Sequence, residues 1–184
     1  MPAEALATTR LLLPIHTEDH VYGAESAAFT LVEYGDYECS ACRRLFVIIR
    51  DLQSTLGRRL RIVYRHFPLG GIHPNAREAA EAAEAAGSQG RFWEMHNLLL
   101  QHQRALKREN LLAYAERLGL DAGRLRAELD ARVYEDRVRE DFRRGVRNGV
   151  YKPPGLFING VRHDGPWGRE ILQRKLTHFL TVSA

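Results

Sequence analysis

The chain has two cysteines in its 184 residues, and they lie three positions apart in Cys39-Ser40-Ala41-Cys42. This spacing suits two kinds of chemistry, thiol–disulfide exchange and metal binding. Exchange needs a thiolate that attacks and a second thiol close enough to release the mixed disulfide. A structural zinc site normally takes four ligands, and here only scattered histidines remain to complete one. The pattern favours exchange, and the cysteine count excludes a framework of structural disulfides.

The residues around the cysteines indicate where the two sulfurs lie. In residues 29–34 the side chains that would face either side of a strand are apolar, apart from Glu33. This pattern predicts a strand covered on both faces. The apolar residues that follow take helical spacing, at Leu45, Phe46, Ile49 and Leu52, and Gly57 ends the pattern. Cys39 then falls in the first turn of a helix, where free backbone N–H groups and the helix dipole lower a thiol pKa. Because Cys42 lies one turn deeper, we predict that Cys39 attacks and Cys42 resolves.

Glu33 is the one ionisable residue in the apolar strand, six positions before Cys39. Burial of a carboxylate is costly, so the pKa of Glu33 is expected to rise. The functional interpretation is that Glu33 accepts the proton of Cys42, directly or through a water molecule. The alternatives are that Glu33 reaches the edge of the sheet or pairs with a nearby arginine.

A long helical stretch interrupts the strand and helix patterns. Residues 60–64 predict a second strand, which completes a βαβ unit. Residues 73–148 have the spacing of five helices and no strand candidate. Asp121 is the expected N-cap of the fourth helix, and Val138, Phe142 and Val146 mark the fifth. This stretch therefore predicts a helical insertion into an α/β domain.

The end of the chain returns to strands. Asn159-Gly160 separates two short apolar runs, 156–158 and 161–163, and this predicts a hairpin. An amphipathic helix follows, with apolar residues at Ile171, Leu172, Leu176 and Phe179. Before the first strand, residues 1–19 show no sustained period, so we expect a loosely packed surface arm and regular structure from about Phe29.

Composition excludes several classes of protein. With 45% hydrophobic and 27% charged residues the chain fits one folded unit and not a disordered one. The formal charge of +4 arises from basic residues mixed with acidic ones, and the cluster at Arg143, Arg144 and Arg147 has no interleaved aromatic residues, so no nucleic-acid partner is expected. No apolar run suits a membrane span or a signal-peptide core. The sequence as written predicts a cytoplasmic protein, or a periplasmic or extracellular one if a leader was removed.

Four motifs in the same order resemble the DsbA-like branch of the thioredoxin superfamily, a bacterial family of thiol-disulfide oxidoreductases. They are FTLVEYGDYECSAC at 29–42, YRHFPL at 64–69, HPNA at 73–76 and FING at 157–160. The resemblance covers about residues 20–181. It implies an α/β, thioredoxin-like fold (βαβ then ββα) formed by residues 20–72 and 149–184. The helical insertion is then 73–148, and 1–19 is the N-terminal arm.

The resemblance also implies roles for individual residues. By position, the nucleophile of the family falls on Cys39, its buried partner on Cys42, its buried acid on Glu33 and its cis-proline on Pro154. That proline would face Cys39, shape the groove that takes an extended substrate, and keep metals away from the dithiol. No metal and no cofactor beyond the Cys39–Cys42 dithiol or disulfide is expected.

Two departures from the family pattern affect the expected direction of exchange. Pro153 precedes the cis-proline position, where threonine or valine is common, and a proline has no N–H to offer a substrate strand. Ser40-Ala41 lacks the histidine that helps to make the strongest oxidants of the family, so the couple should be more reducing. We therefore expect reduction or isomerisation of protein disulfides, with a redox partner that regenerates the dithiol or disulfide.

Several alternatives remain open. An exported protein would act as a disulfide-forming oxidase. The cysteine pair would otherwise serve a metal-binding or metal-delivery module, or the helical insertion would be a scaffold that binds a partner while the dithiol acts as a switch. His66, His73 and His96 are candidates to line the groove, although a single histidine on an apolar helix face is more often a packing residue.

Overall fold

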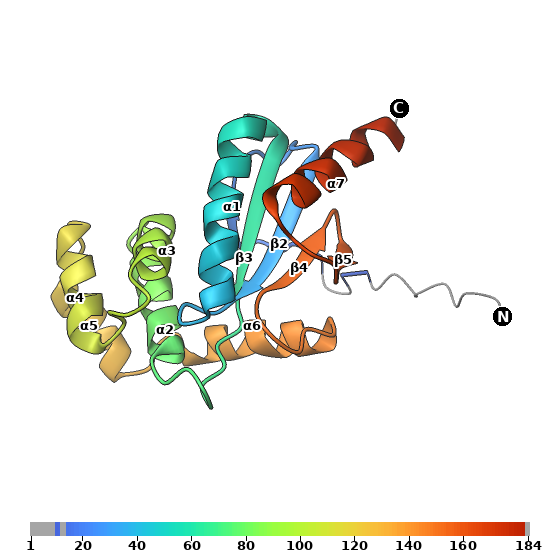
Figure 1. Cartoon of the computed structure of the whole chain (residues 1–184). Coiled ribbons are helices and arrows are strands. Elements are labelled where there is room, and N and C mark those ends of the chain that lie inside the picture. Colours follow the sequence, from blue (N-terminus) through green and yellow to red (C-terminus); the bar gives the residue numbers. More distant parts are fainter. Residues whose placement is uncertain (1–9, 12–13, 183–184) are drawn as a thin grey trace.

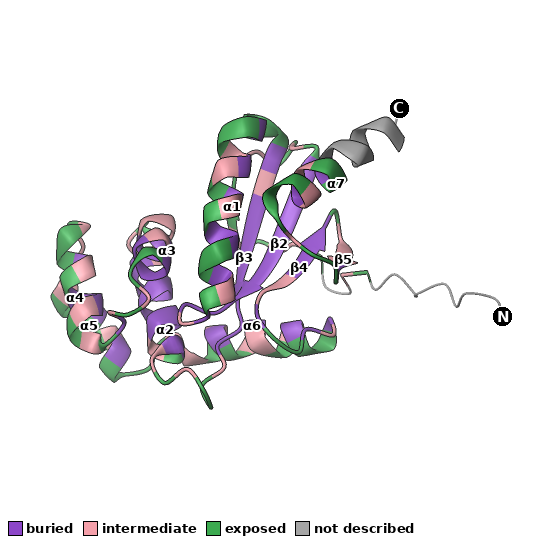
Figure 2. Ribbon diagram, in the orientation of Figure 1, coloured by how far each residue is buried: buried purple, intermediate pink, exposed green. Residues whose placement is uncertain are grey.

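The computed structural model describes residues 10–11 and 14–182, the last of these, 177–182, by their backbone alone. Its sheet has five strands in the order β1-β3-β2-β4-β5 (Figure 1). The strands are β1 (His20–Tyr22), β2 (Phe29–Gly35), β3 (Leu60–His66), β4 (Gly155–Ile158) and β5 (Val161–His163). β2 and β3 are parallel, and the other neighbours are antiparallel. All seven residues of β2 are buried, as expected for a strand that is covered on both faces (Figure 2).

The helices cover both faces of the sheet. They are α1 (Ser40–Leu56), α2 (Ala76–Gly87), α3 (Phe92–Gln101), α4 (Arg108–Arg117), α5 (Ala122–Asp130), α6 (Glu135–Arg147) and α7 (Arg169–Val182), with a 3-10 turn at Gly57–Arg59. α1 and α7 bury their apolar residues against one face, and α6 packs on the other. α2 to α5 pack together beside α1 and form a third apolar core (Figure 1). The predicted α/β, thioredoxin-like fold is confirmed, and α2 to α6 all lie between β3 and β4.

No helix in the part of the chain that the structure describes has the length and apolar character needed to cross a membrane.

The segment before β2 differs from the expectation. Regular structure begins before Phe29, because β1 pairs antiparallel with β3 through His20, Val21 and Tyr22. A strand of three residues is too short to show a period in the sequence, and its pairing with β3 alone defines it. Residues 1–9 and 12–13 of the expected arm lie outside the described residues, but Asp19 is buried, so the expected loose packing is wrong there.

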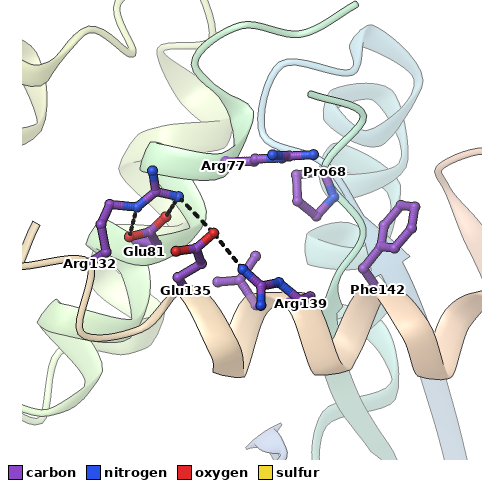
Figure 3. Close-up of a pocket in the computed structure, with 8 residues that line it drawn as sticks. Pro68, Arg77, Glu81, Arg132, Glu135, Arg139 and Phe142 are labelled. Atoms are coloured by element: carbon purple, nitrogen blue, oxygen red, sulfur yellow. Dashed lines mark hydrogen bonds and ion pairs between the residues drawn. The ribbon is translucent and has the colours of Figure 1, made fainter. Parts of the chain in front are cut away.

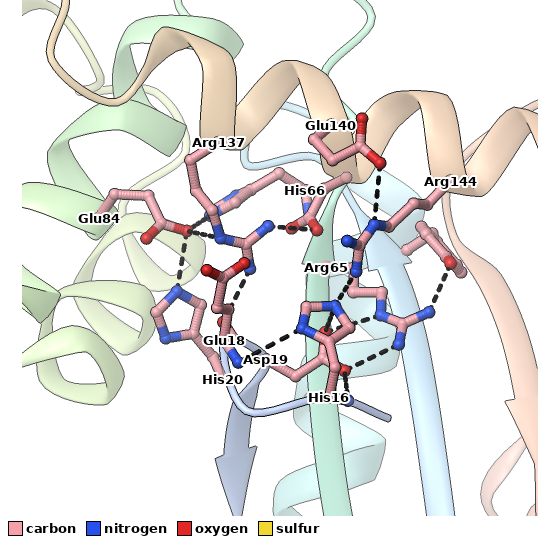
Figure 4. A network of polar contacts seen from close by, with 12 residues as sticks. His16, Glu18, Asp19, His20, Arg65, His66, Glu84, Arg137, Glu140 and Arg144 are labelled. Carbon is pink, nitrogen blue, oxygen red and sulfur yellow. Dashed lines mark hydrogen bonds and ion pairs between the residues drawn. The ribbon is translucent and has the colours of Figure 1, made fainter. Parts of the chain in front are cut away.

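A buried ion pair attaches this segment to the sheet (Figure 4). The Arg65 guanidinium is fully buried and donates from Nε and Nη2 to the two carboxylate oxygens of Asp19, both at 2.8 Å. Its Nη1 donates to the Tyr34 hydroxyl at 2.8 Å, and Nη2 also donates to the carbonyl of Pro14. Burial alone would raise the pKa of Asp19, but the hydrogen bonds from Arg65 hold it below its usual value. The pair therefore joins the chain before β1 to the C-terminal end of β3.

Replacement of Asp19 by alanine should lower the free energy of unfolding by about 3 kcal/mol, because it leaves a buried guanidinium without its carboxylate. Chemical denaturation of Asp19→Ala and of wild type measures the difference. Glu18→Ala, an exposed neighbour, is the control and should change the stability little. Equal unfolding midpoints for Asp19→Ala and wild type would show that the pair contributes nothing to the fold.

Candidate active site

The two cysteines lie at the start of α1, as predicted. Cys39 is the residue that precedes the helix, with extended backbone angles (φ −72, ψ 116), and α1 begins at Ser40. Both thiols are free. The side chain of Cys39 retains 8% exposure, whereas Cys42 is 0% exposed and packs in the core. Both cysteines are therefore buried, the second more completely than the first.

The surroundings of the two thiols shift their pKa values in opposite directions. The Cys42 thiol donates a hydrogen bond to Cys39, and the backbone N–H groups of Cys42 and Ala41 also stabilise the Cys39 thiolate. These bonds outweigh burial and the negative charge of Asp36, and they lower the pKa of Cys39 to about 6. Burial, together with the same bond to Cys39, raises the pKa of Cys42 well above its usual value. At neutral pH Cys39 is ionised and Cys42 is protonated.

Glu33 lies in β2, the central strand of the sheet, and is 2% exposed. Burial, and then the negative charge of Cys39, raise the pKa of Glu33 to about 8. The predicted rise in pKa is therefore confirmed. Its Oε1 atom has no hydrogen-bond partner, and no ion pair joins Glu33 to any other described residue. Both alternatives considered for Glu33, a position at the sheet edge and a pair with arginine, are wrong.

The Pro153–Pro154 segment lies next to Cys39. The peptide bond between the two prolines is cis, as the resemblance implied for Pro154. Pro153 is buried and Pro154 is half-buried, directly before β4. The carbonyl oxygen of Pro153 lies 3.6 Å from Cys39 Sγ, a distance at which the protonated form of the thiol can donate a hydrogen bond to it. The structure thus brings together the cysteines and the proline pair, although they are more than a hundred residues apart in the chain.

Gln103 is a site residue that the sequence reasoning missed. It follows α3, and its Nε2 donates to the carbonyl oxygens of Tyr37 at 2.7 Å and Cys39 at 2.9 Å. These bonds connect the helical region to the turn that carries the nucleophile. One glutamine among many polar residues gives no periodic or motif signal, so only the tertiary structure identifies it.

Asp36 is a second missed residue and holds the turn between β2 and α1. It is 1% exposed and accepts hydrogen bonds from the backbone N–H groups of Glu38 and Leu69, both at 2.8 Å. His73 Nδ1 lies 2.8 Å from the same carboxylate. The bond to Glu38, two residues further on, is an Asx turn, which the Gly35-Asp36 step directly after a strand could have indicated.

The candidate histidines occupy three different surroundings. His73 contacts Asp36 at the edge of the site. His96 Nδ1 lies 3.1 Å from the Tyr37 hydroxyl, and burial, with the nearby charges of His66 and His20, lowers the pKa of His96 to about 3. The interpretation of His96 as a buried packing residue is therefore the better one.

His66 belongs to a polar network that has the composition of a metal site (Figure 4). His20, His66 and Glu84 place ligand atoms within 4.8 Å of one another. Both histidine Nε2 atoms already bond to Glu84 Oε1, at 2.8 and 2.9 Å, and the Arg137 guanidinium lies 3.9 Å from the same oxygen. These contacts describe an ion-paired network, and neither cysteine belongs to it.

A small cavity of about 120 Å³ lies between α2 and α6 (Figure 3). Its carboxylates are paired, since Glu81 and Glu135 both contact Arg132 and Glu135 also contacts Arg139. Neither cysteine lines this cavity, so it is not part of the dithiol site.

Comparison with known proteins identifies the family. The family model described as Thioredoxin matches residues 16–177. The chain belongs to the thioredoxin family. Its fold matches oxidised BdbD from Bacillus subtilis, with a TM-score of 0.81 and 20% identity over 89% of this chain and 93% of that one. It also matches α-DsbA1 from Wolbachia pipientis, with a TM-score of 0.77 and 17% identity over 92% and 94% of the two chains. The resemblance to the DsbA-like branch is confirmed for the fold.

Curated relatives of this thioredoxin-family chain are longer proteins with a different name. The chain is 45% identical over 168 residues to Na(+)/H(+) antiporter NhaA 1 of Salinispora arenicola, and the aligned region covers 91% of this chain and 26% of that protein. It is 42% identical over 172 residues to NhaA 1 of Mycolicibacterium gilvum, covering 91% and 28%. The chain spans about a quarter of the length of these relatives.

Proposed function

We propose that the protein exchanges disulfides with protein substrates through a mixed disulfide at Cys39. The Cys39 thiolate attacks a substrate disulfide, one sulfur of the substrate leaves as a thiolate, and the Cys42 thiolate then displaces the second. The products are a reduced substrate and a Cys39–Cys42 disulfide, and the reverse sequence oxidises a substrate dithiol. The opposite pKa shifts of the two thiols support this proposal, because Cys39 is ionised and keeps 8% exposure while Cys42 is protonated and fully buried.

Glu33 is the proposed acceptor of the Cys42 proton. Before the reaction the Cys39 thiolate helps to keep Glu33 protonated, since its negative charge raises the Glu33 pKa. The mixed disulfide has no charge on Cys39, so the pKa of Glu33 falls when Cys42 must lose its proton. More of Glu33 therefore loses its own proton to solvent at this step, and the carboxylate that forms can accept the proton of Cys42. In this proposal no cofactor takes part other than the dithiol.

The prolines are the proposed docking point for an extended substrate. Pro153 has no N–H group, so its carbonyl oxygen is the backbone group that remains to pair with a substrate strand at this residue. That oxygen is in contact with Cys39 Sγ, which would place a substrate disulfide beside the nucleophile.

The reductase or isomerase direction is the one we favour. The Cys39 pKa of about 6 lies between the values of about 3.5 for the oxidant DsbA and about 7 for thioredoxin. A thiolate of intermediate stability gives the Cys39–Cys42 couple an intermediate reduction potential. We expect it to lie between about −270 mV, the value for thioredoxin, and about −120 mV, the value for DsbA. Equilibration with glutathione buffers measures it, together with reduction of insulin and repair of scrambled ribonuclease. A potential near that of DsbA would support the oxidase alternative instead.

Metal binding by the cysteine pair is the competing hypothesis. Among the described residues, no cluster of three or more ligating side chains includes Cys39 or Cys42. Metal analysis of the purified protein beside a thiol titration separates the hypotheses. Two titratable thiols without stoichiometric metal support exchange, and retained zinc or copper(I) supports metal delivery.

A further inference from the structure

A cavity of about 610 Å³ opens between α1, α3 and the β1–β3 edge, on the sheet face that α1 covers. Apolar side chains form much of its wall, namely Phe46, Ile49, Leu60, Ile62 and Trp93. Glu33, Tyr64 and His96 reach the wall from the protein core. Cavities of about 300–1,000 Å³ with apolar walls and a few polar groups are the usual sites for small-molecule ligands.

The buried polar groups of this cavity carry no charge at neutral pH. The pKa of Glu33 is about 8 and that of His96 is about 3, both because of burial, so the acid is protonated and the imidazole is neutral. Glu33 Oε1 has no hydrogen-bond partner among the described residues, although the side chain is 2% exposed. An unpaired buried oxygen favours a ligand or water molecule that supplies the missing hydrogen bond.

The exposed end of the cavity is positively charged. Arg50 and Arg58 line it, both are exposed, and neither forms an ion pair with a described residue. The Arg50 guanidinium lies over the Phe46 ring, 5.7 Å from its centre, and so stays at the cavity. Asp51, the acid beside Arg50, pairs with Arg169 of α7 and does not line the cavity. The remaining polar side chains at the cavity are those of Tyr22, Gln53, Ser54 and Asn97.

We propose that this cavity binds an amphipathic monoanion, with an apolar body between α1 and α3 and a carboxylate at Arg50 and Arg58. The apolar body replaces water against the aliphatic and aromatic wall, and the two guanidinium groups satisfy the negative charge. A cation of the same shape would meet two unpaired arginines, so charge selects the ligand class. The cavity shares Glu33 with the dithiol site, but its occupancy does not depend on the function proposed for Cys39.

Tryptophan fluorescence provides the test. The chain has two tryptophans, so Trp167→Phe leaves Trp93, in the cavity wall, as the reporter. Decanoate below its micelle concentration should change Trp93 emission in a saturable way, and decyltrimethylammonium, which has the same chain, should bind at least tenfold more weakly. Arg50→Ala together with Arg58→Ala should weaken decanoate binding by about tenfold or more, since hydrogen bonds to charged groups are lost.

Two further variants separate a built site from general attraction. Arg59→Ala removes a charge from the same turn but does not line the cavity, and it should leave decanoate binding unchanged. Ile49→Phe narrows the cavity without adding a tryptophan, and it should weaken decanoate binding while the circular dichroism spectrum stays native. The proposal is overturned if decanoate gives no saturable change, if the cation binds equally well, or if Arg59→Ala weakens binding as much as the Arg50 and Arg58 pair.

Discussion

Replacement of Cys39 by serine should reduce disulfide exchange to the background rate, whereas replacement of Cys42 should give an enzyme that attacks and then stalls. A serine hydroxyl is not ionised at neutral pH and cannot form a disulfide, so Cys39→Ser loses the first step entirely. In Cys42→Ser the nucleophile remains but the resolving thiol is absent, so the mixed disulfide accumulates. Insulin reduction measures turnover, and non-reducing electrophoresis with mass spectrometry measures the trapped species.

The Cys42→Ser variant should keep the hydrogen bond that stabilises the Cys39 thiolate. The hydrogen bond from the Cys42 thiol is the largest contribution that lowers the pKa of Cys39. A serine at position 42 donates a similar bond, so the attacking thiolate should persist there. Ser40→Ala, an exposed change in the same turn, serves as the control and should retain turnover. Exchange activity in Cys39→Ser, or a mixed disulfide located on Cys42 of wild type, would contradict the assignment.

Replacement of Glu33 by glutamine should stabilise the protein increasingly as the pH rises. The carboxyl has a folded pKa of about 8 against an ordinary value of 4.5. An acid with a raised folded pKa contributes its stability below the unfolded pKa and loses it as the pH rises through the folded pKa. The free energy of unfolding of the wild type should therefore fall by about 5 kcal/mol relative to that of Glu33→Gln as the pH rises between these two pKa values. Above about pH 8 the difference between the two proteins should stay constant.

Urea denaturation of the reduced proteins across this pH range measures the effect. The Cys39 thiolate titrates in both proteins, so its contribution largely cancels in the difference. Glu109→Gln removes an exposed carboxyl of α4 and controls for the loss of one acidic residue. A wild-type to Glu33→Gln difference that is constant with pH would show that Glu33 titrates normally.

The same variant tests the proton transfer. Glu33→Gln should slow resolution of the mixed disulfide by about 10²-fold, within the range for loss of a general base, because the glutamine amide cannot accept the Cys42 proton. The attack of Cys39 should be slowed much less, since its thiolate is stabilised by Cys42 and backbone N–H groups. Stopped-flow measurement of the two steps separates them, and equal slowing of both would argue for a structural role of Glu33.

Local sequence signals predicted most of the elements that carry the site. Apolar spacing gave the strand that holds Glu33 and the helix that begins after Cys39, and Asn159-Gly160 gave the hairpin, where both residues have positive φ. Asp121 is the N-cap of α5, and its side chain accepts a hydrogen bond from the Arg124 N–H. These features depend on interactions within a few residues, which is why the sequence alone indicates them.

Features that depend on distant residues were not predicted. Val146 was expected on the apolar face of α6 but is 51% exposed, because a residue eight positions after Val138 has rotated away from the contact line of an α-helix. α6 instead buries Asp141, which accepts a hydrogen bond from the His66 N–H, and Gly145, where a Cβ atom would lie 2.6 Å from the Phe67 ring. Gln103, Asp36 and β1 are likewise defined by long-range partners.

Titration of the reduced thiols, by the ultraviolet absorbance of the thiolate, measures the ionised state of Cys39 most directly. We expect one transition near pH 6 that disappears in Cys39→Ser, and we expect iodoacetamide to alkylate Cys39 first. A transition only near the ordinary thiol pKa, about 8.5, or first alkylation at Cys42, would show that Cys39 is not the ionised nucleophile.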